Sequence, residues 1–182
     1  MALLKLNRLK TKAIRFFTRS YINSKKPLQT KDLARNKNIR VLISRPNHRL
    51  GNQLLITPLI QEVKKEFPAS KIDLVVNGNL SSVLFSEDSH IGKIFNLPKK
   101  PFNNIFKYLA KSISLIFTNY DIAIAACDHS NSSKIFVKLS RAKLKIYNSA
   151  SEALQKPEHI AKRPVFNFKK FLNSSEDLSG YE

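Results

Sequence analysis

Short apolar runs alternate with longer segments of helical periodicity from residue 39 onward. The apolar runs predict five strands, at residues 39–44, 71–76, 93–97, 121–126 and 143–147. Apolar residues at intervals of three and four predict helices between them, at residues 52–67, 80–85, 102–117 and 131–140. Strands that alternate with helices predict a parallel sheet covered on both faces. We therefore expect an α/β, Rossmann-like, doubly wound fold.

The first 38 residues follow a different pattern. Apolar residues between positions 3 and 21 fall on one face of a predicted helix, and residues 23–38 form a polar linker. The other face of the helix carries basic residues, which we expect to contact a membrane: Lys5, Arg8, Lys12, Arg15 and Arg19. One apolar and one basic face are typical of a helix at an anionic membrane surface. The alternative is a helix packed on the domain with its basic face in solvent.

The chain is strongly basic. Its 182 residues include 32 Lys and Arg against 13 Asp and Glu, which gives a formal net charge of +19. This charge indicates an anionic partner, such as nucleic acid, an anionic membrane surface or a phosphorylated substrate. The single cysteine, Cys127, excludes an internal disulfide and a cysteine-based zinc cluster. We find neither a secretory signal nor a transmembrane-length apolar span, and expect a cytoplasmic protein, peripheral at the inner face of the membrane.

The turn between the first strand and the first helix, residues 44–53, is the most informative stretch. Helix N-termini leave backbone N–H groups unpaired and carry a positive dipole end, so they suit polar ligands. We expect the polar residues of the turn, and a glycine that permits close approach, to bind substrate: Ser44, Arg45, Asn47, Arg49, Gly51 and Gln53. The two arginines suit phosphates and acidic sugars, because a guanidinium donates two parallel hydrogen bonds.

Two titratable residues are candidates for a proton acceptor near this turn. His48 lies in the turn itself, and a neutral imidazole can take a proton. Asp128 follows the fourth predicted strand. The carboxyl ends of parallel strands share one edge of the sheet, so the two turns are expected to converge. The alternatives are a surface histidine and an ordinary polar turn.

Several short motifs occur in an order that characterises a known family. They are Arg49-Leu50-Gly51-Asn52, Thr57-Pro58-Leu59, Phe67-Pro68-Ala69-Ser70-Lys71-Ile72-Asp73, Leu97-Pro98-Lys99, Tyr120-Asp121-Ile122-Ala123-Ile124 and Leu139-Ser140-Arg141-Ala142-Lys143. Together they resemble glycosyltransferase family 9, the heptosyltransferases that build the inner core of lipopolysaccharide. The resemblance runs from about residue 39 to about residue 170.

The resemblance implies an inverting GT-B enzyme with two Rossmann-like domains that face each other across a cleft. In this family the N-terminal domain receives a lipid-linked glycan acceptor. The C-terminal domain holds a nucleotide-sugar donor, typically ADP-heptose, and neither a metal nor another cofactor is used. Residues 39–150 would then be the acceptor-side domain, and residues 151–182 a tail leading toward a missing donor-binding domain.

The resemblance also places Asn52 where the family usually has an aspartate, thought to act as the general base. An amide has no useful basicity near neutral pH, so Asn52 could orient an acceptor hydroxyl but could not take its proton. Loss of a general base would slow transfer by about 10²–10⁴-fold.

Two other interpretations stay open. The chain could be a truncated, catalytically inactive acceptor-binding remnant, or a basic nucleic-acid-binding module. Gly51 is isolated, so the turn has neither a dinucleotide-binding fingerprint nor a phosphate-binding loop. Because the basic residues concentrate in the predicted N-terminal helix and no nucleic-acid motif occurs, nucleic acid is not the expected partner.

Overall fold

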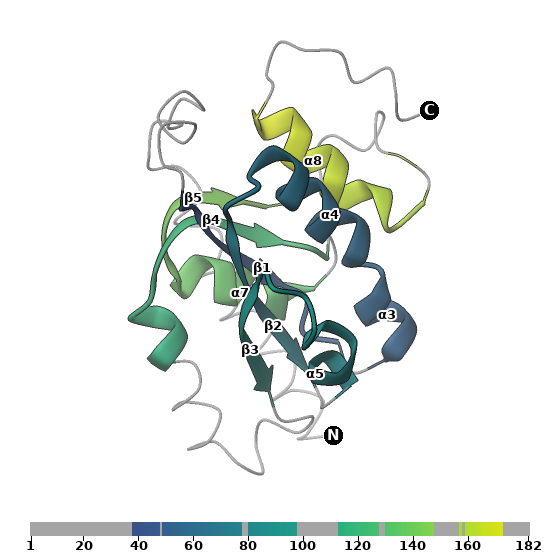
Figure 1. Ribbon diagram of the computed structural model, residues 1–182, viewed down its shortest axis with the longest axis horizontal. Helices are drawn as coiled ribbons and strands as arrows, with labels where there is room; N and C mark the ends of the chain where they lie inside the picture. The colour runs from purple at the N-terminus through teal and green to yellow at the C-terminus, as the bar shows by residue number, and fades with distance from the viewer. Residues whose placement is uncertain are drawn as a thin grey trace, which may run out of the picture.

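The computed structural model describes residues 38–47, 49–77, 80–97, 113–127, 130–147, 157 and 159–172. The expected N-terminal helix and linker, His48, Asp128 and the greater part of the expected helix at 102–117 lie outside these residues. Within them the chain forms a five-stranded sheet (Figure 1). Its strands are β1 (Arg40–Ser44), β2 (Lys71–Asn77), β3 (Ile91–Leu97), β4 (Asn119–Ala125) and β5 (Arg141–Ile146).

All pairs in the sheet are parallel, in the order β3-β2-β1-β4-β5. The five strands lie where the apolar runs predicted them, which confirms the doubly wound α/β fold. The order reverses between β1 and β4, because the chain builds outward from β1 first toward β3 and then toward β5. Open α/β sheets bind their ligands outside the carboxyl ends of the strands at such a point.

Helices cover both faces of the sheet. They are α3 (Leu50–Leu54), α4 (Thr57–Glu66), α5 (Leu80–Phe85), α7 (Asn131–Leu139) and α8 (Lys162–Leu172). Helices α4 and α8 pack on one face, and α7 packs on the other against β1, β4 and β5 (Figure 1). A hydrophobic core lies on each face of the sheet, and β1 contributes side chains to both. Val41 and Ile43 point to the α4 side, and Leu42 points to the α7 side.

The helix predicted over residues 52–67 is two helices, α3 and α4, with a break at Leu55 and Ile56. Pro58 explains the break, because it has no N–H to donate to the preceding turn and is tolerated only in the first turn of a helix. It stands in that first turn of α4.

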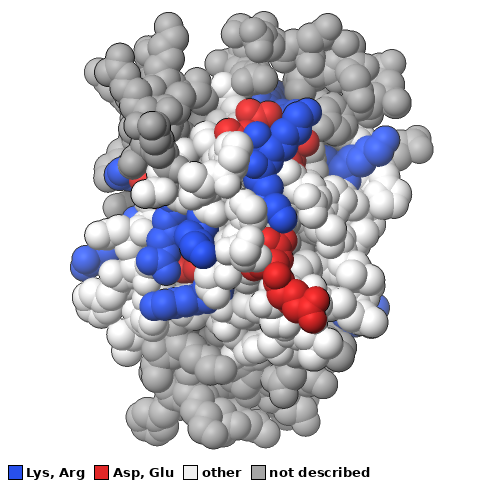
Figure 2. Space-filling view, in the orientation of Figure 1, with Lys and Arg blue, Asp and Glu red and all other residues white. Residues whose placement is uncertain are grey.

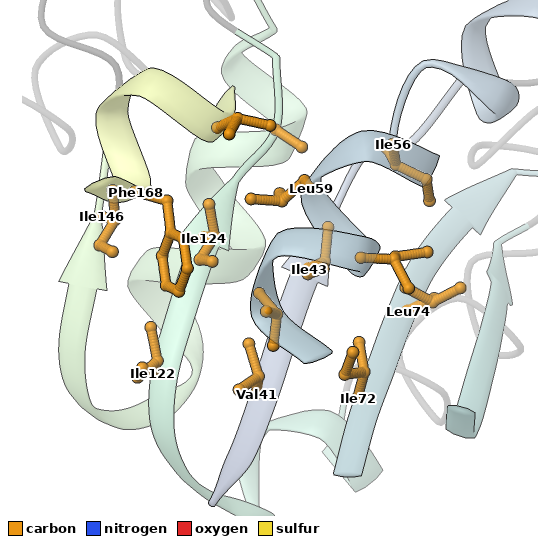
Figure 3. Close-up of a cluster of buried hydrophobic side chains, with 14 of the residues drawn as sticks. Val41, Ile43, Ile56, Leu59, Ile72, Leu74, Ile122, Ile124, Ile146 and Phe168 are labelled. Carbon is orange, nitrogen blue, oxygen red and sulfur yellow. The ribbon is translucent and has the colours of Figure 1, made fainter. Parts of the chain in front are cut away.

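Helix α8 was not expected from the sequence. It falls within residues 151–182, which we expected to be a tail, and it carries part of the main core. Phe168 is fully buried over the β4 and β5 side chains Ile124 and Ile146 (Figure 3). Its ring meets that of Phe67 edge to face, with centroids 6.4 Å apart. The folded unit therefore extends to residue 172.

Tyr147, which follows β5, makes the free energy of unfolding depend on pH in the alkaline range. Burial raises the pKa of its phenol to about 12, whereas an unfolded tyrosine ionises near pH 10. Between these values the unfolded state binds fewer protons than the folded state, so stability falls as pH rises. Tyr147→Phe removes this dependence. We expect urea unfolding at pH 9 and pH 12 to show the variant losing about 1–2 kcal/mol less than the unaltered chain; equal losses would contradict the assignment.

Candidate functional site

The candidate site begins where β1 ends, at the reversal of strand order. The Ser44 carbonyl accepts hydrogen bonds from the Ala126 N–H, at 3.0 Å, and from the Ser133 hydroxyl on α7. The Arg45 guanidinium donates through Nη1 to the Ala126 carbonyl. These bonds tie the turn after β1 to the segment after β4. The sequence prediction that the two segments converge is therefore confirmed at Ser44 and Ala126.

Arg45 does not lie where a ligand would reach it. Only 4% of the residue is exposed, and its guanidinium bonds to the backbone that follows β4. A buried arginine is stable only when its N–H groups find acceptors inside the protein. The sequence prediction made Arg45 a substrate contact, but its burial assigns it to the fold.

Gln53 is also buried, with none of its surface exposed. Its Nε2 donates to the carbonyls of Asn47, at 3.0 Å, and Asn77, at 2.9 Å. The Asn77 side chain donates to the Pro46 carbonyl at 3.4 Å. Gln53, predicted to bind substrate, thus holds the turn after β1 against the end of β2. The role that the geometry supports for Gln53 is positioning.

Ser44 is fully buried as well, and its hydroxyl oxygen has no hydrogen-bond partner among the described residues. The same holds for the Gln53 Oε1 and Asn77 Oδ1 atoms. Three buried side-chain oxygens therefore lack a hydrogen-bond partner among the described residues. Buried polar groups of this kind are commonly satisfied by internal water.

The turn after β1 and the start of α3, residues 44–47 and 49–53, form a corner at the carboxyl edge of the sheet. The exposed part of this corner is formed by Arg49, Gly51 and Asn52. Arg49 is exposed, and its N–H donates to the Asn47 Oδ1 atom at 3.0 Å, which shapes the turn. Asn52 and Asn47 are partly exposed. A Cβ added to Gly51 would meet nothing within 4 Å, so the expected steric need for glycine is not found. The reason is that Gly51 faces outward on α3, where open space is available to a ligand.

The exposed corner therefore offers a guanidinium and neutral amides. None of residues 44–47 and 49–53 is acidic, so these residues can donate to anions and hydroxyls but supply no carboxylate base. No group of three His, Cys, Asp or Glu side chains able to hold a metal occurs among the described residues. The two base candidates, His48 and Asp128, follow Asn47 and Cys127 directly in the chain, and both remain predictions.

Ser133 and Asn77 hold the corner together, and neither was expected from the sequence. Ser133 has a weak local signal, since Ser130 caps α7 by accepting from the Ser133 N–H at 3.2 Å. Nothing near Asn77 predicts its bond to Pro46, which lies 31 positions earlier.

The search of protein-family descriptions found no match, and the search of curated sequences found none either. Solved structures do match. The E. coli heptosyltransferase WaaC with ADP aligns at a TM-score of 0.58 and 20% identity, over 78% of this chain and 50% of that one. WaaC with ADP-2-deoxy-2-fluoro heptose aligns at 0.58 and 20%, over 79% and 51%.

A glycosyl transferase family 9 structure from Veillonella parvula aligns at a TM-score of 0.56 and 18% identity, over 76% of this chain and 42% of that one. The chain thus spans about half the length of the structures that it matches. These structures belong to the family that the sequence motifs resemble. The chain has the fold of a Rossmann-like half of a family 9 glycosyltransferase.

Proposed function

We propose that this chain is the acceptor-binding half of a glycosyltransferase of the heptosyltransferase type. It would take part in the transfer of a sugar from a nucleotide-sugar donor to lipopolysaccharide or a related glycan. The donor that we propose is ADP-heptose. The observation that carries the proposal is the shared fold: the chain aligns with about half of the E. coli heptosyltransferase WaaC, in structures with ADP and with an ADP-heptose analogue.

The exposed corner gives the acceptor site. Arg49 lies in solvent at the carboxyl edge of the sheet and offers a fixed charge with paired donors to a phosphate or acidic sugar. Asn52, one α-helical turn from Arg49, would hydrogen-bond the acceptor hydroxyl. Binding and orienting the acceptor is the part of the reaction that these residues can perform.

Proton transfer needs another group, because the Asn52 amide accepts no proton near neutral pH. We propose His48 or Asp128 for this role, since each follows directly a segment that the structure brings to the same edge. The amide at position 52 also favours a second candidate function, an acceptor-binding remnant without catalysis. The two candidates share the acceptor site and differ only in whether a base is supplied.

The proposal is tested by equilibrium binding of a deacylated, phosphorylated inner-core oligosaccharide, measured by calorimetry. We expect Arg49→Ala to weaken binding about tenfold, because charge-assisted hydrogen bonds to a phosphate are lost. Lys71→Ala is the matched control: Lys71 is exposed at the amino end of β2, where its Nζ donates only to the Ser89 carbonyl among the described contacts.

Equal losses in Arg49→Ala and Lys71→Ala would show non-specific charge attraction and contradict the site. Binding of ADP-heptose without binding of the oligosaccharide would contradict the assignment as the acceptor half. Removing the lipid from the probe keeps this measurement separate from any membrane binding.

A further inference from the structure

Three large apolar side chains are exposed just before the starts of β4 and β5, at the amino edge of the sheet and opposite the candidate site. Ile113 and Phe117 stand one helical turn apart, with the Phe117 N–H bonded to the Ile113 carbonyl at 3.0 Å, and are 51% and 65% exposed. Leu139, at the end of α7, is 47% exposed. The pairing of Asn119 with Arg141 aligns the starts of β4 and β5, two residues after Phe117 and Leu139.

Two basic side chains stand in the first half of β5, and one of them contacts Phe117. The Arg141 guanidinium lies over the Phe117 ring, 5.0 Å from its centroid. Lys143 is 57% exposed and pairs with Asp121 at 2.7 Å. We call Ile113, Phe117, Leu139 and Arg141 the amino-edge patch.

The whole β5 side of the sheet is positively charged. Residues 130–147 contain five basic residues and no acidic one: Lys134, Lys138, Arg141, Lys143 and Lys145. In Figure 2 blue side chains gather on the left, where Figure 1 draws β5 and α7, and most red ones lie nearer the middle. The acidic residues of the described part lie elsewhere, apart from the paired Asp121.

We propose that the amino-edge patch docks the domain on an anionic lipid surface. Exposed aliphatic and aromatic side chains gain free energy by leaving water for the acyl region. Basic residues next to them are attracted to anionic headgroups. Ile113 and Leu139 favour a lipid surface over nucleic acid as the partner. Aliphatic side chains gain little binding free energy from contact with a polyanion such as nucleic acid. The proposal is independent of the proposed enzymatic function.

Docking by this patch fixes the orientation of the domain. Strand β4 spans seven residues, or about 23 Å at 3.3 Å per residue. The candidate site at the carboxyl edge would then stand roughly 20 Å from the lipid surface. Only a glycan that projects from its lipid anchor would reach it.

The chain contains no tryptophan, so a single introduced tryptophan reports on its own position. We expect Phe117→Trp to shift its emission to shorter wavelength and to be quenched by brominated lipid on vesicles of phosphatidylcholine and phosphatidylglycerol. Val83→Trp is the control: Val83 is 78% exposed on α5, which packs against β3 and α3. Its emission is expected to stay unchanged, even if residues 1–22 bind the same vesicles.

Binding strength gives a second measurement. In vesicle sedimentation Phe117→Ser is expected to lower the partition coefficient about tenfold, and Arg141→Gln about fivefold. Val83→Ser and Lys65→Gln, an exposed lysine on α4, are expected to leave it unchanged. Circular dichroism checks that the variants fold.

Three results would overturn the proposal. The first is a fluorescence emission of the Phe117→Trp variant that vesicles do not change. The second is equal loss of binding in Phe117→Ser and Val83→Ser. The third is Arg141-dependent binding of a DNA or RNA oligonucleotide by a chain that does not bind vesicles, which would identify a nucleic-acid surface instead.

Discussion

Asp73→Ala is expected to lower the free energy of unfolding by about 3–5 kcal/mol. Asp73 lies in β2 with none of its surface exposed, and its carboxylate joins β2 to three other strands. It accepts from Arg40 through Nε at 3.2 Å and Nη2 at 2.9 Å, from the Tyr120 hydroxyl at 2.9 Å, and from the Lys93 N–H at 2.8 Å. Alanine would remove the shared acceptor of the buried Tyr120 hydroxyl and of the partly buried Arg40 guanidinium and Lys93 N–H, so these groups lose a strong hydrogen bond inside the protein.

Strand β3 approaches Asp73 closely. A Cβ added to Gly92 would lie 2.5 Å from the Asp73 Oδ1 atom, so only glycine lets β3 approach the carboxylate. Burial, followed by the charge and hydrogen bond of Asp73, raises the pKa of Tyr120. The phenol therefore remains a hydrogen-bond donor throughout the physiological pH range.

Urea or thermal unfolding measures the loss, with Asp88→Ala as the control. Asp88 also pairs with a lysine, Lys64, at 3.0 Å, but both side chains are partly exposed. Such pairs contribute below about 1 kcal/mol. If Asp73→Ala were no more destabilising than Asp88→Ala, the carboxylate would not be the structural hub that its contacts indicate.

The sequence predicted elements whose signal is local. Helix α5 occupies residues 80–85, as expected, and all five strands were found because each is a short apolar run between polar segments. Helix α8 was missed for a physical reason. Pro164 and Asn167 interrupt its apolar pattern, and its buried face is defined only by contact with α4 and the sheet.

The convergence of the segments after β1 and β4 was predicted, but the orientation of their side chains was not. The rule that parallel strands end at one edge located the corner, and the bond between Ala126 and Ser44 confirms it. Which side chains face outward could not be predicted. Arg45 and Arg49 look alike in the turn, yet Arg45 is buried because it bonds to the Ala126 carbonyl, 81 positions away.

The same dependence on distant partners makes Phe168→Ala a severe substitution. We expect it to lower the free energy of unfolding by about 3–5 kcal/mol, from the lost burial and the cavity left behind. Phe168 is fully buried in the main core, and its ring packs against that of Phe67. Removing the ring would expose β4 and β5 side chains beneath α8, including Ile124 and Ile146 (Figure 3).

Thermal unfolding tests this expectation, with Ile160→Ala as the control. Ile160 precedes α8 and is 54% exposed, so its truncation should change stability by less than about 0.5 kcal/mol. A small effect of Phe168→Ala would mean that α8 separates from the domain without loss, so that the core closes before residue 157. A large effect would show that residues 162–172 complete the hydrophobic core.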